Sequence, residues 1–345
     1  MEQTVKRYDN LDGLRAYSAI GILAMHVLSN GGYALEGNLL AQWAGVLGDL
    51  VLLFMMVSAF SMCCGYYERI RTGSITPDQF YSKRFQKIWP FFAALNLLDL
   101  AVSPSVDSVY EAFANLTLCY GLLPNPDIKV IGVGWTLGVI FVFYLLFPFF
   151  CFLLGSRKRA WLAFLVSLGL HFICREHFLG SDYVVNSFSS RTNILYCGMF
   201  FLAGGMIYLY REELARGSQK FPVLRHMWLL AALILCCLPG RSSWKELVLF
   251  ALLLIWAVVG GGGRLLSNRF TCFVSGISME IYLSHMVVFR ILEKLGVLHL
   301  LSTDFLNWLL ASVLTFAGAA IAAEAFRFVW GKLTVFIRKR GYFHG

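Results

Sequence analysis

The stretch LDGLRA at residues 11–16, followed by an apolar run that reaches His26, decides how this chain folds. The run YSAIGILAM at residues 17–25 has the composition of a membrane-spanning helix, yet an acid and an arginine stand at its start. A charged side chain at the centre of a bilayer costs about 2.5–3.5 kcal/mol on insertion scales, so such groups lie near an interface, face a wet cavity or pair with one another. The segment therefore predicts a first span that carries functional polar side chains.

Three polar side chains share one face of this predicted helix. Arg15 and His26 are eleven residues apart, which places them within roughly 20° of each other around the helix and about 16 Å apart along it. Asp12 lies one turn before Arg15, in the same sector. A carboxylate, a guanidinium and an imidazole thus form one stripe on a helix that is otherwise mostly apolar.

The composition of the whole chain predicts a polytopic membrane protein. Of the 345 residues, 58% are hydrophobic and 14% are charged, and the mean hydropathy is +0.67, which is too apolar for a soluble domain. Asp12 and Arg15 stand inside the first apolar run and no cleavage site follows it, so we expect no cleavable signal peptide. The nine cysteines show no metal-binding or redox spacing. We interpret them as small apolar residues and expect no metal.

Apolar runs predict an all-α integral membrane bundle of about ten spans. These lie at residues 12–29, 45–66, 88–103, 131–154, 160–175, 192–210, 226–240, 246–260, 270–291 and 305–328, and segment 108–122 fits a re-entrant or interfacial helix. Of the 29 Lys and Arg residues, 21 fall in segments on the N-terminal side of the membrane and 7 on the other, with Arg15 in the first span. This asymmetry predicts that both termini are cytoplasmic. We expect one domain, residues 1–345, with no appended extracytoplasmic domain.

The pattern that begins at Arg7, continues through LDGLRA and closes at His26 resembles the opening of the family-3 membrane acyltransferases. Those enzymes move acetyl or other acyl groups from an acyl-coenzyme A onto sugars of surface or secreted glycans. The resemblance covers nearly all of the chain, and it implies that Arg15 and His26 are the catalytic pair. His26 would be a general base or would itself accept the acyl group. On the pattern alone, it could instead form a hydrogen bond across the bundle.

The basic segment YSKRFQKIWP at residues 81–90 resembles the family's Arg-x-x-Arg block before a helix that starts with proline. The resemblance implies that Arg84 and Lys87 bind the donor, acetyl-coenzyme A, through its pyrophosphate and ribose phosphate. Lys87 stands where the family has a second arginine, and it keeps the charge but loses the bidentate geometry. The alternative is that the segment is only a positive-inside topology signal.

Two further stretches resemble family blocks and point to supporting residues. FMMVSAF at residues 54–60 contains Ser58, and Ala59 stands where glycine is usual, so backbones are expected to approach less closely there. The alternative is plain helix packing by small residues. WTLGVIFVFYLLFP at residues 135–148 supplies Trp135 and Tyr144, but Ile140 occupies a position where the family often has glutamate.

The late stretch SMEIYLSH at residues 278–285 resembles the family's Tyr-Leu-x-His segment. It implies supporting roles for Glu280 and His285, and Glu280 is the candidate to replace the carboxylate missing at Ile140. The alternative is a polar patch that is satisfied within the bundle. Asp49, near the outer end of the second span, either lines the acceptor side or is simply solvated.

Together these patterns predict O-acyl transfer, foremost O-acetyl transfer, from cytoplasmic acyl-coenzyme A to a carbohydrate of the cell envelope or a secreted glycan. The protein is expected to be a multi-pass protein of the cell membrane that has no nucleic-acid partner. A transporter or glycan exporter is the alternative, because it too needs many spans and buried charges. Transporters often have helices that Gly or Pro interrupts at matching positions in two halves of the chain, and this sequence shows no such pattern. A catalytically dead receptor gains support from Ile140, whereas intact Arg15 and His26 oppose it.

Overall fold

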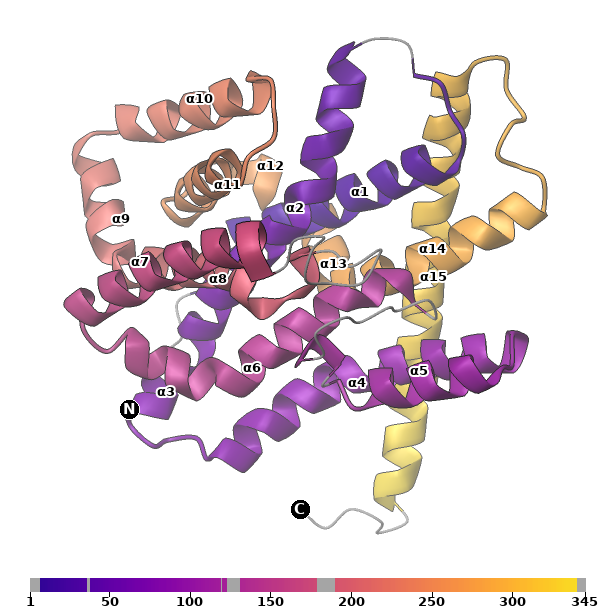
Figure 1. Ribbon diagram of the computed structural model, residues 1–345, viewed down its shortest axis with the longest axis horizontal. Coiled ribbons are helices and arrows are strands. Elements are labelled where there is room, and N and C mark those ends of the chain that lie inside the picture. The colour runs from indigo at the N-terminus through magenta and orange to yellow at the C-terminus, as the bar shows by residue number, and fades with distance from the viewer. Residues whose placement is uncertain (1–6, 36–37, 119, 123–130, 179–189, 340–345) are drawn as a thin grey trace.

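The computed structural model describes residues 7–35, 38–118, 120–122, 131–178 and 190–339 (Figure 1). Within these residues the chain forms helices and no strand, which confirms the all-α fold class. The α-helices are α1 (Asn10–Asn30), α2 (Asn38–Met62), α3 (Glu68–Arg71), α4 (Pro77–Val102), α5 (Val106–Leu116), α6 (Trp135–Leu153), α7 (Arg157–Ile173), α8 (Ile194–Leu209), α9 (Arg211–Lys220), α10 (Val223–Cys237), α11 (Ser243–Val258), α12 (Gly263–Leu266), α13 (Arg269–Gly276), α14 (Ser278–Lys294) and α15 (Asp304–Lys339). The short turns are the π-helices η1 (Cys63–Tyr67) and η4 (Cys174–Phe178), and the 3₁₀-helices η2 (Tyr120–Leu122), η3 (Gly132–Gly134) and η5 (Ser190–Thr192).

Among the described residues, four helical segments are long and apolar enough to cross a membrane. They are Asn10–Asn30, Gly45–Arg71, Gly132–Leu153 and Asp304–Phe336. Two bent pairs raise the number to six: Ile194–Leu209 with Arg211–Lys220, bent by 60°, and Ser243–Val258 with Gly263–Gly276, bent by 108°. Length and composition therefore establish four to six candidate spans in this part of the chain.

The predicted span at residues 270–291 is wrong as a single helix. The chain breaks at Ile277, whose backbone (φ −111°, ψ 14°) leaves the helical region between α13 and α14. Hydropathy does not register this break, because the residues on both sides remain largely apolar. The ambiguous segment 108–122 contains part of α5, which has 11 residues and exposes Val106, Tyr110 and Phe113. A helix of that length is too short to span a bilayer, which fits both the re-entrant and the interfacial interpretation.

Helix α1 packs against six other helices: α2, α11, α12, α13, α14 and α15 (Figure 1). Small buried residues such as Ala16, Ala19 and Gly21 let these neighbours approach. The closest approach is at Gly13, where an added Cβ would lie 2.4 Å from the Cα of Leu266 in α12. The glycine of the LDGLRA stretch is therefore required by packing.

The looser backbone approach expected at Ala59 is not found, because the opposite helix supplies a glycine. A Cβ added to Gly204 in α8 would lie 2.2 Å from the carbonyl oxygen of Met56 and 3.1 Å from the Cβ of Ala59. Alanine on α2 is thus compatible with tight packing because α8 contributes the glycine.

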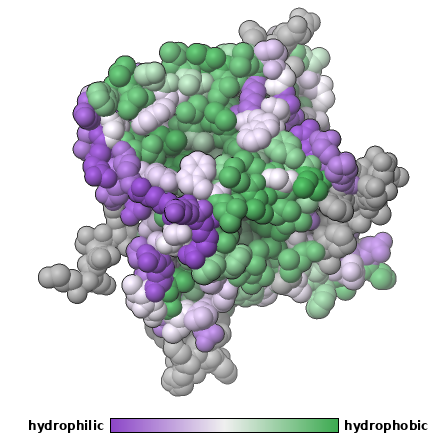
Figure 2. All heavy atoms as spheres, turned by 60° about the vertical axis from the view of Figure 1, so that its left-hand side comes forward, coloured by the Kyte–Doolittle hydropathy of each residue, from purple (hydrophilic) through white to green (hydrophobic). Residues whose placement is uncertain are grey.

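Much of the outer surface is apolar. Large hydrophobic side chains are exposed along α7, α10 and α15, among them Leu162, Leu165, Leu230, Leu233 and Ile321. Figure 2 shows hydrophobic residues over much of one face, with hydrophilic residues in a band that runs from its upper left to its lower middle and in a second group at its upper right. A surface of this kind fits a bilayer and would be unusual for a protein surrounded by water.

The packing at Gly13 gives a testable prediction. Gly13→Ala places a methyl group against the backbone of Leu266, which cannot move aside like a flexible side chain, so we expect a loss of about 1–3 kcal/mol. Gly169→Ala in α7 is the matched control, because nothing lies within 4 Å of its added Cβ. Thermal unfolding of the purified protein in detergent should show a lower Tm for the first variant alone. Equal Tm values would contradict the close approach of α1 and α12.

Candidate functional site

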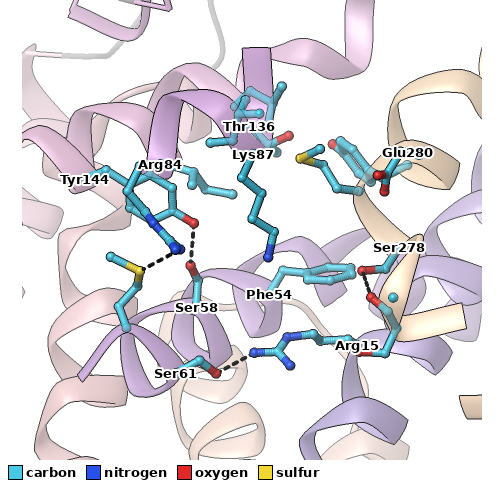
Figure 3. A pocket seen from close by; sticks show the side chains of 18 of the residues that line it. Arg15, Phe54, Ser58, Ser61, Arg84, Lys87, Thr136, Tyr144, Ser278 and Glu280 are labelled. Atoms are coloured by element: carbon cyan, nitrogen blue, oxygen red, sulfur yellow. Dashed lines mark hydrogen bonds between the residues drawn. The ribbon is translucent and has the colours of Figure 1, made fainter. Parts of the chain in front are cut away.

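A cavity of 420 Å³ opens among α1, α2, α4, α6, α13, α14 and α15 (Figure 3). Its volume lies within the range of small-molecule binding sites. The wall combines apolar side chains with a ring of charged and hydroxyl groups; the apolar members include Val51, Phe54, Ile88, Leu137 and Ile140. Six residues predicted from the sequence line this one cavity: Arg15, Ser58, Arg84, Lys87, Tyr144 and Glu280.

The charge of the cavity is strongly positive. Four cations line it, Arg15, Arg84, Lys87 and Arg327, whereas Glu280 is the one carboxylate among the lining residues. The ammonium of Lys87 points into the cavity (Figure 3), and within the described residues it forms no ion pair or hydrogen bond. An excess of one sign of charge around a cavity concentrates ligands of the opposite sign. The cavity therefore suits a ligand with several negative charges.

Arg84 is held by aromatic side chains from two other elements. It donates to the hydroxyl of Tyr66 at 2.6 Å, and its guanidinium lies 4.7 Å from the centre of the Tyr66 ring and 5.9 Å from that of Tyr144. Tyr66 belongs to η1, a π-helical turn of a kind that is frequent at functional sites. Tyr144 in turn lies 3.5 Å from the hydroxyl of Ser58. The predicted residues Ser58, Arg84 and Tyr144 thus form one connected group.

Arg15 is positioned by its own helix and by α2. It donates to Ser61 at 2.5 Å, and its guanidinium lies 3.5 Å from Asp12. Asp12 does not line the cavity; it also accepts from Ser275 at 2.7 Å and from Arg7 at 3.1 Å. This hydrogen bond raises the pKa of Arg7 above its ordinary value. Asp12 therefore supports Arg15 from outside the cavity wall, because it also binds Arg7 and Ser275 of α13.

The imidazoles of His26 and His285 are joined by a hydrogen bond of 3.1 Å between Nδ1 of His26 and Nε2 of His285. Nδ1 of His285 lies 2.6 Å from the carbonyl oxygen of Tyr282. Because a carbonyl only accepts, that nitrogen carries the proton, and Nε2 of the neutral ring must accept. His26 is then the donor through Nδ1, which leaves the lone pair on its Nε2. In this pair His26 can therefore act as a base through Nε2.

The predicted stripe on α1 is divided between two places. Arg15 faces the cavity, whereas His26, His285 and Trp135 are not among the residues that line it. Tyr282 connects the two parts, since its side chain lines the cavity and its carbonyl group holds His285. The site therefore consists of a cationic cavity and an adjoining histidine pair.

Arg327 and Tyr66 are two of the cavity residues that were not singled out from the sequence. Arg327 donates to Glu280 at 3.1 and 3.2 Å and also to the carbonyl group of Gly276. A cue was present in the sequence, since Glu324 and Arg327 lie one turn apart within a predicted span. Tyr66, which holds Arg84, gave no such cue. Glu280 and Ile140 line the same cavity, so α14 brings a carboxylate to the space where α6 offers none.

Asp49 is not solvated, so that alternative from the sequence is wrong. It is 3% exposed and pairs with Arg191 at 3.2 Å and with Arg241 at 2.5 Å. Trp135 lies in the same region, with its ring 5.9 Å from the guanidinium of Arg191. Among the described residues, no group of three or more His, Cys, Asp or Glu side chains could hold a metal ion.

Comparison with known protein families gives one result that covers most of the chain. The sequence profile of a family described as an acyltransferase domain matches residues 8–324. That range contains every residue of the cavity and of the histidine pair apart from Arg327. No curated protein and no solved structure matches the chain.

Proposed function

The chain belongs to the family-3 acyltransferases, and from that premise we propose that it is an O-acyltransferase, foremost an O-acetyltransferase, of carbohydrate hydroxyls. The observation that carries the proposal is the combination of a cationic cavity with an adjoining histidine whose Nε2 is free to accept a proton. We further propose that the acceptor is a glycan of the cell envelope or a secreted glycan, and that the protein lies in the cell membrane.

The proposed donor is acetyl-coenzyme A, a substrate consumed in each turnover. Its phosphates require several cations, and Arg84 and Lys87 face the same cavity as Arg15 and Arg327. Charge-assisted hydrogen bonds from guanidinium groups to phosphate are among the stronger polar contacts. Arg84 is already oriented by Tyr66, so little side-chain entropy would be lost when it binds phosphate.

The proposed chemistry follows from the tautomers of the histidine pair. In one route Nε2 of His26 removes the proton of the acceptor hydroxyl, whose oxygen bonds to the acyl carbon as the carbon–sulfur bond breaks; the leaving thiolate then takes that proton. In the other route Nε2 first bonds to the acyl carbon as the carbon–sulfur bond breaks and the thiolate leaves. The acceptor oxygen then bonds to the acyl carbon as the bond to Nε2 breaks, and the hydroxyl proton goes to the thiolate. His285 serves both routes by holding Nδ1 of His26.

We propose a topology of about ten spans with both termini in the cytoplasm, supported by the 21-to-7 division of basic residues. Reporter fusions should test it. A reporter placed after Arg159 or Arg216 should be cytoplasmic, and one placed next to Trp244 should lie outside. An external reporter after Arg216 would contradict this topology. The predicted outer position at Asp182 lies outside the described residues.

The role of His26 can be tested by substitution in cells with equal protein levels. His26→Ala should lower glycan acylation by about 10²–10⁴-fold if His26 is a general base, and should abolish it if His26 carries the acyl group. His226→Ala is the control, since that histidine is exposed on α10. Loss of acetyl groups from surface glycans is measured by mass spectrometry. Near-normal acylation by His26→Ala would reject this chemistry and favour a transporter or glycan exporter.

The donor assignment predicts a selective effect on KM. Arg84→Ala combined with Lys87→Ala should raise the KM for acetyl-coenzyme A more than about tenfold, because each charge-assisted contact contributes about 1.5–3 kcal/mol. The KM for the acceptor should change little, and Lys87→Arg should be tolerated. Lys83→Ala is the control, because Lys83 lies on α4 but does not line the cavity. Equal effects of Lys83→Ala and Lys87→Ala would mean that this basic segment is only a topology signal.

A further inference from the structure

Glu280 is the one carboxylate among the described residues that line the cavity, and the chemistry proposed above does not use it. It lies in the first turn of α14 and is 9% exposed. Nε and Nη2 of Arg327 both donate to one of its oxygens, Oε1, at 3.2 and 3.1 Å. The same Nη2 also donates to the carbonyl group of Gly276, at the end of α13. A side chain from α15 therefore holds the carboxylate of Glu280 in one orientation.

The second oxygen of Glu280 is unused. Within the described residues Oε2 accepts no hydrogen bond, and it is not among the side-chain atoms that are buried without a partner. It therefore faces open space, which is the cavity, because Glu280 belongs to the cavity wall. A carboxylate oxygen accepts hydrogen bonds. The cationic wall thus offers a ligand one acceptor that is fixed in place.

The position of Glu280 indicates which part of the donor meets this acceptor. Figure 3 shows Arg84 and Glu280 on opposite sides of the cavity. Along α14, Glu280 lies about 7.5 Å before His285, the partner of His26. An arm that joins phosphates at Arg84 to a thioester at His26 has to cross toward α14, where Glu280 lies. Phosphates repel a carboxylate, whereas the pantetheine arm of coenzyme A contains secondary amides whose N–H groups donate hydrogen bonds.

We propose that Oε2 of Glu280 binds an amide N–H of the pantetheine arm of the acyl donor, and that Arg327 is the positioning residue that fixes this carboxylate. The inference rests on the proposed function, which supplies the donor. It gives the cavity two kinds of recognition, since the cations bind the phosphates and Glu280 binds the neutral arm. A ligand that carries the phosphates without the arm gains no contact from Glu280 and is repelled by its charge.

The test compares two ligands on the purified full-length protein in detergent, with dissociation constants from isothermal titration calorimetry. Coenzyme A has the phosphates and the arm, whereas adenosine 3′,5′-bisphosphate has phosphates alone. Glu280→Gln should weaken coenzyme A by about 10–100-fold, as the loss of a hydrogen bond to a charged group does. The same variant should bind adenosine 3′,5′-bisphosphate equally or more tightly, because the cavity loses a negative charge.

Glutamine is the informative substitution because of the direction of its hydrogen bonds. A guanidinium only donates, so Arg327 binds the amide oxygen of Gln and leaves the amide nitrogen toward the cavity. The side chain keeps nearly the same volume, but the acceptor of the wild type is replaced by a donor, which cannot bind an amide N–H.

Glu324→Gln is the matched control, because Glu324 also pairs with Arg327, at 3.7 Å, but does not line the cavity. It should keep both dissociation constants within about threefold of the wild type. If Glu280 is only a counter-ion of the cations, Glu280→Gln should tighten both ligands. If Glu280 only holds α14 and α15 together, both ligands should weaken and the Tm should fall. Either result overturns the proposal.

The outcomes also separate this inference from the proposed function. A wild-type protein that does not bind coenzyme A would reject the proposed donor, and the role of Glu280 with it. Binding of coenzyme A that is weakened by Arg84→Ala combined with Lys87→Ala, but withstands Glu280→Gln, would reject the role of Glu280 alone.

Discussion

Polar groups on a helix that lies within an apolar bundle must be satisfied by neighbouring helices, and this constraint connects the fold to the site. Three polar side chains of α1 meet partners on three different helices: Asp12 meets Ser275 of α13, Arg15 meets Ser61 of α2, and His26 meets His285 of α14. The same contacts that compensate for placing charge on this helix also fix the directions of its side chains. Gly13 in turn lets α12 approach the same helix closely.

Much of this arrangement could be predicted from the local sequence, because helical periodicity and the positions of the charged residues define the stripe on α1. The resemblance to an enzyme family added Ser58, Arg84, Tyr144 and Glu280, all of which face one cavity. Residues brought in by tertiary packing could not be predicted in this way. The pairing of Glu280 with Arg327 joins positions 47 residues apart, and no local pattern states which of many arginines will be the partner. The helix break at Ile277 could not be predicted from the sequence either, because the hydropathy does not change across it.

Departures from the family pattern are matched by residues on other helices. Alanine at position 59 packs closely because α8 offers Gly204. Ile140 leaves α6 without a carboxylate, yet Glu280 of α14 lines the same cavity with Arg327 bound to it. Lys87 has one compact charge where the family has a planar group, but three guanidinium groups share its cavity. The chemistry of the cavity is therefore a property of the assembled wall, and substitution at a single motif position does not define it.

Tyr282 determines how the two parts of the site communicate. Its side chain belongs to the cavity wall, while its carbonyl oxygen fixes the proton on Nδ1 of His285 and, through Nε2, the orientation of His26. A ligand that shifts α14 at this residue must alter the histidine pair as well, because side chain and carbonyl move with one backbone. Packed helices resist small continuous displacements, so a ligand that fits without moving Tyr282 leaves the base in place. The orientation of the pair is thus linked to the shape of the cavity through Tyr282, and the position of Tyr282 decides whether a bound ligand meets an oriented base.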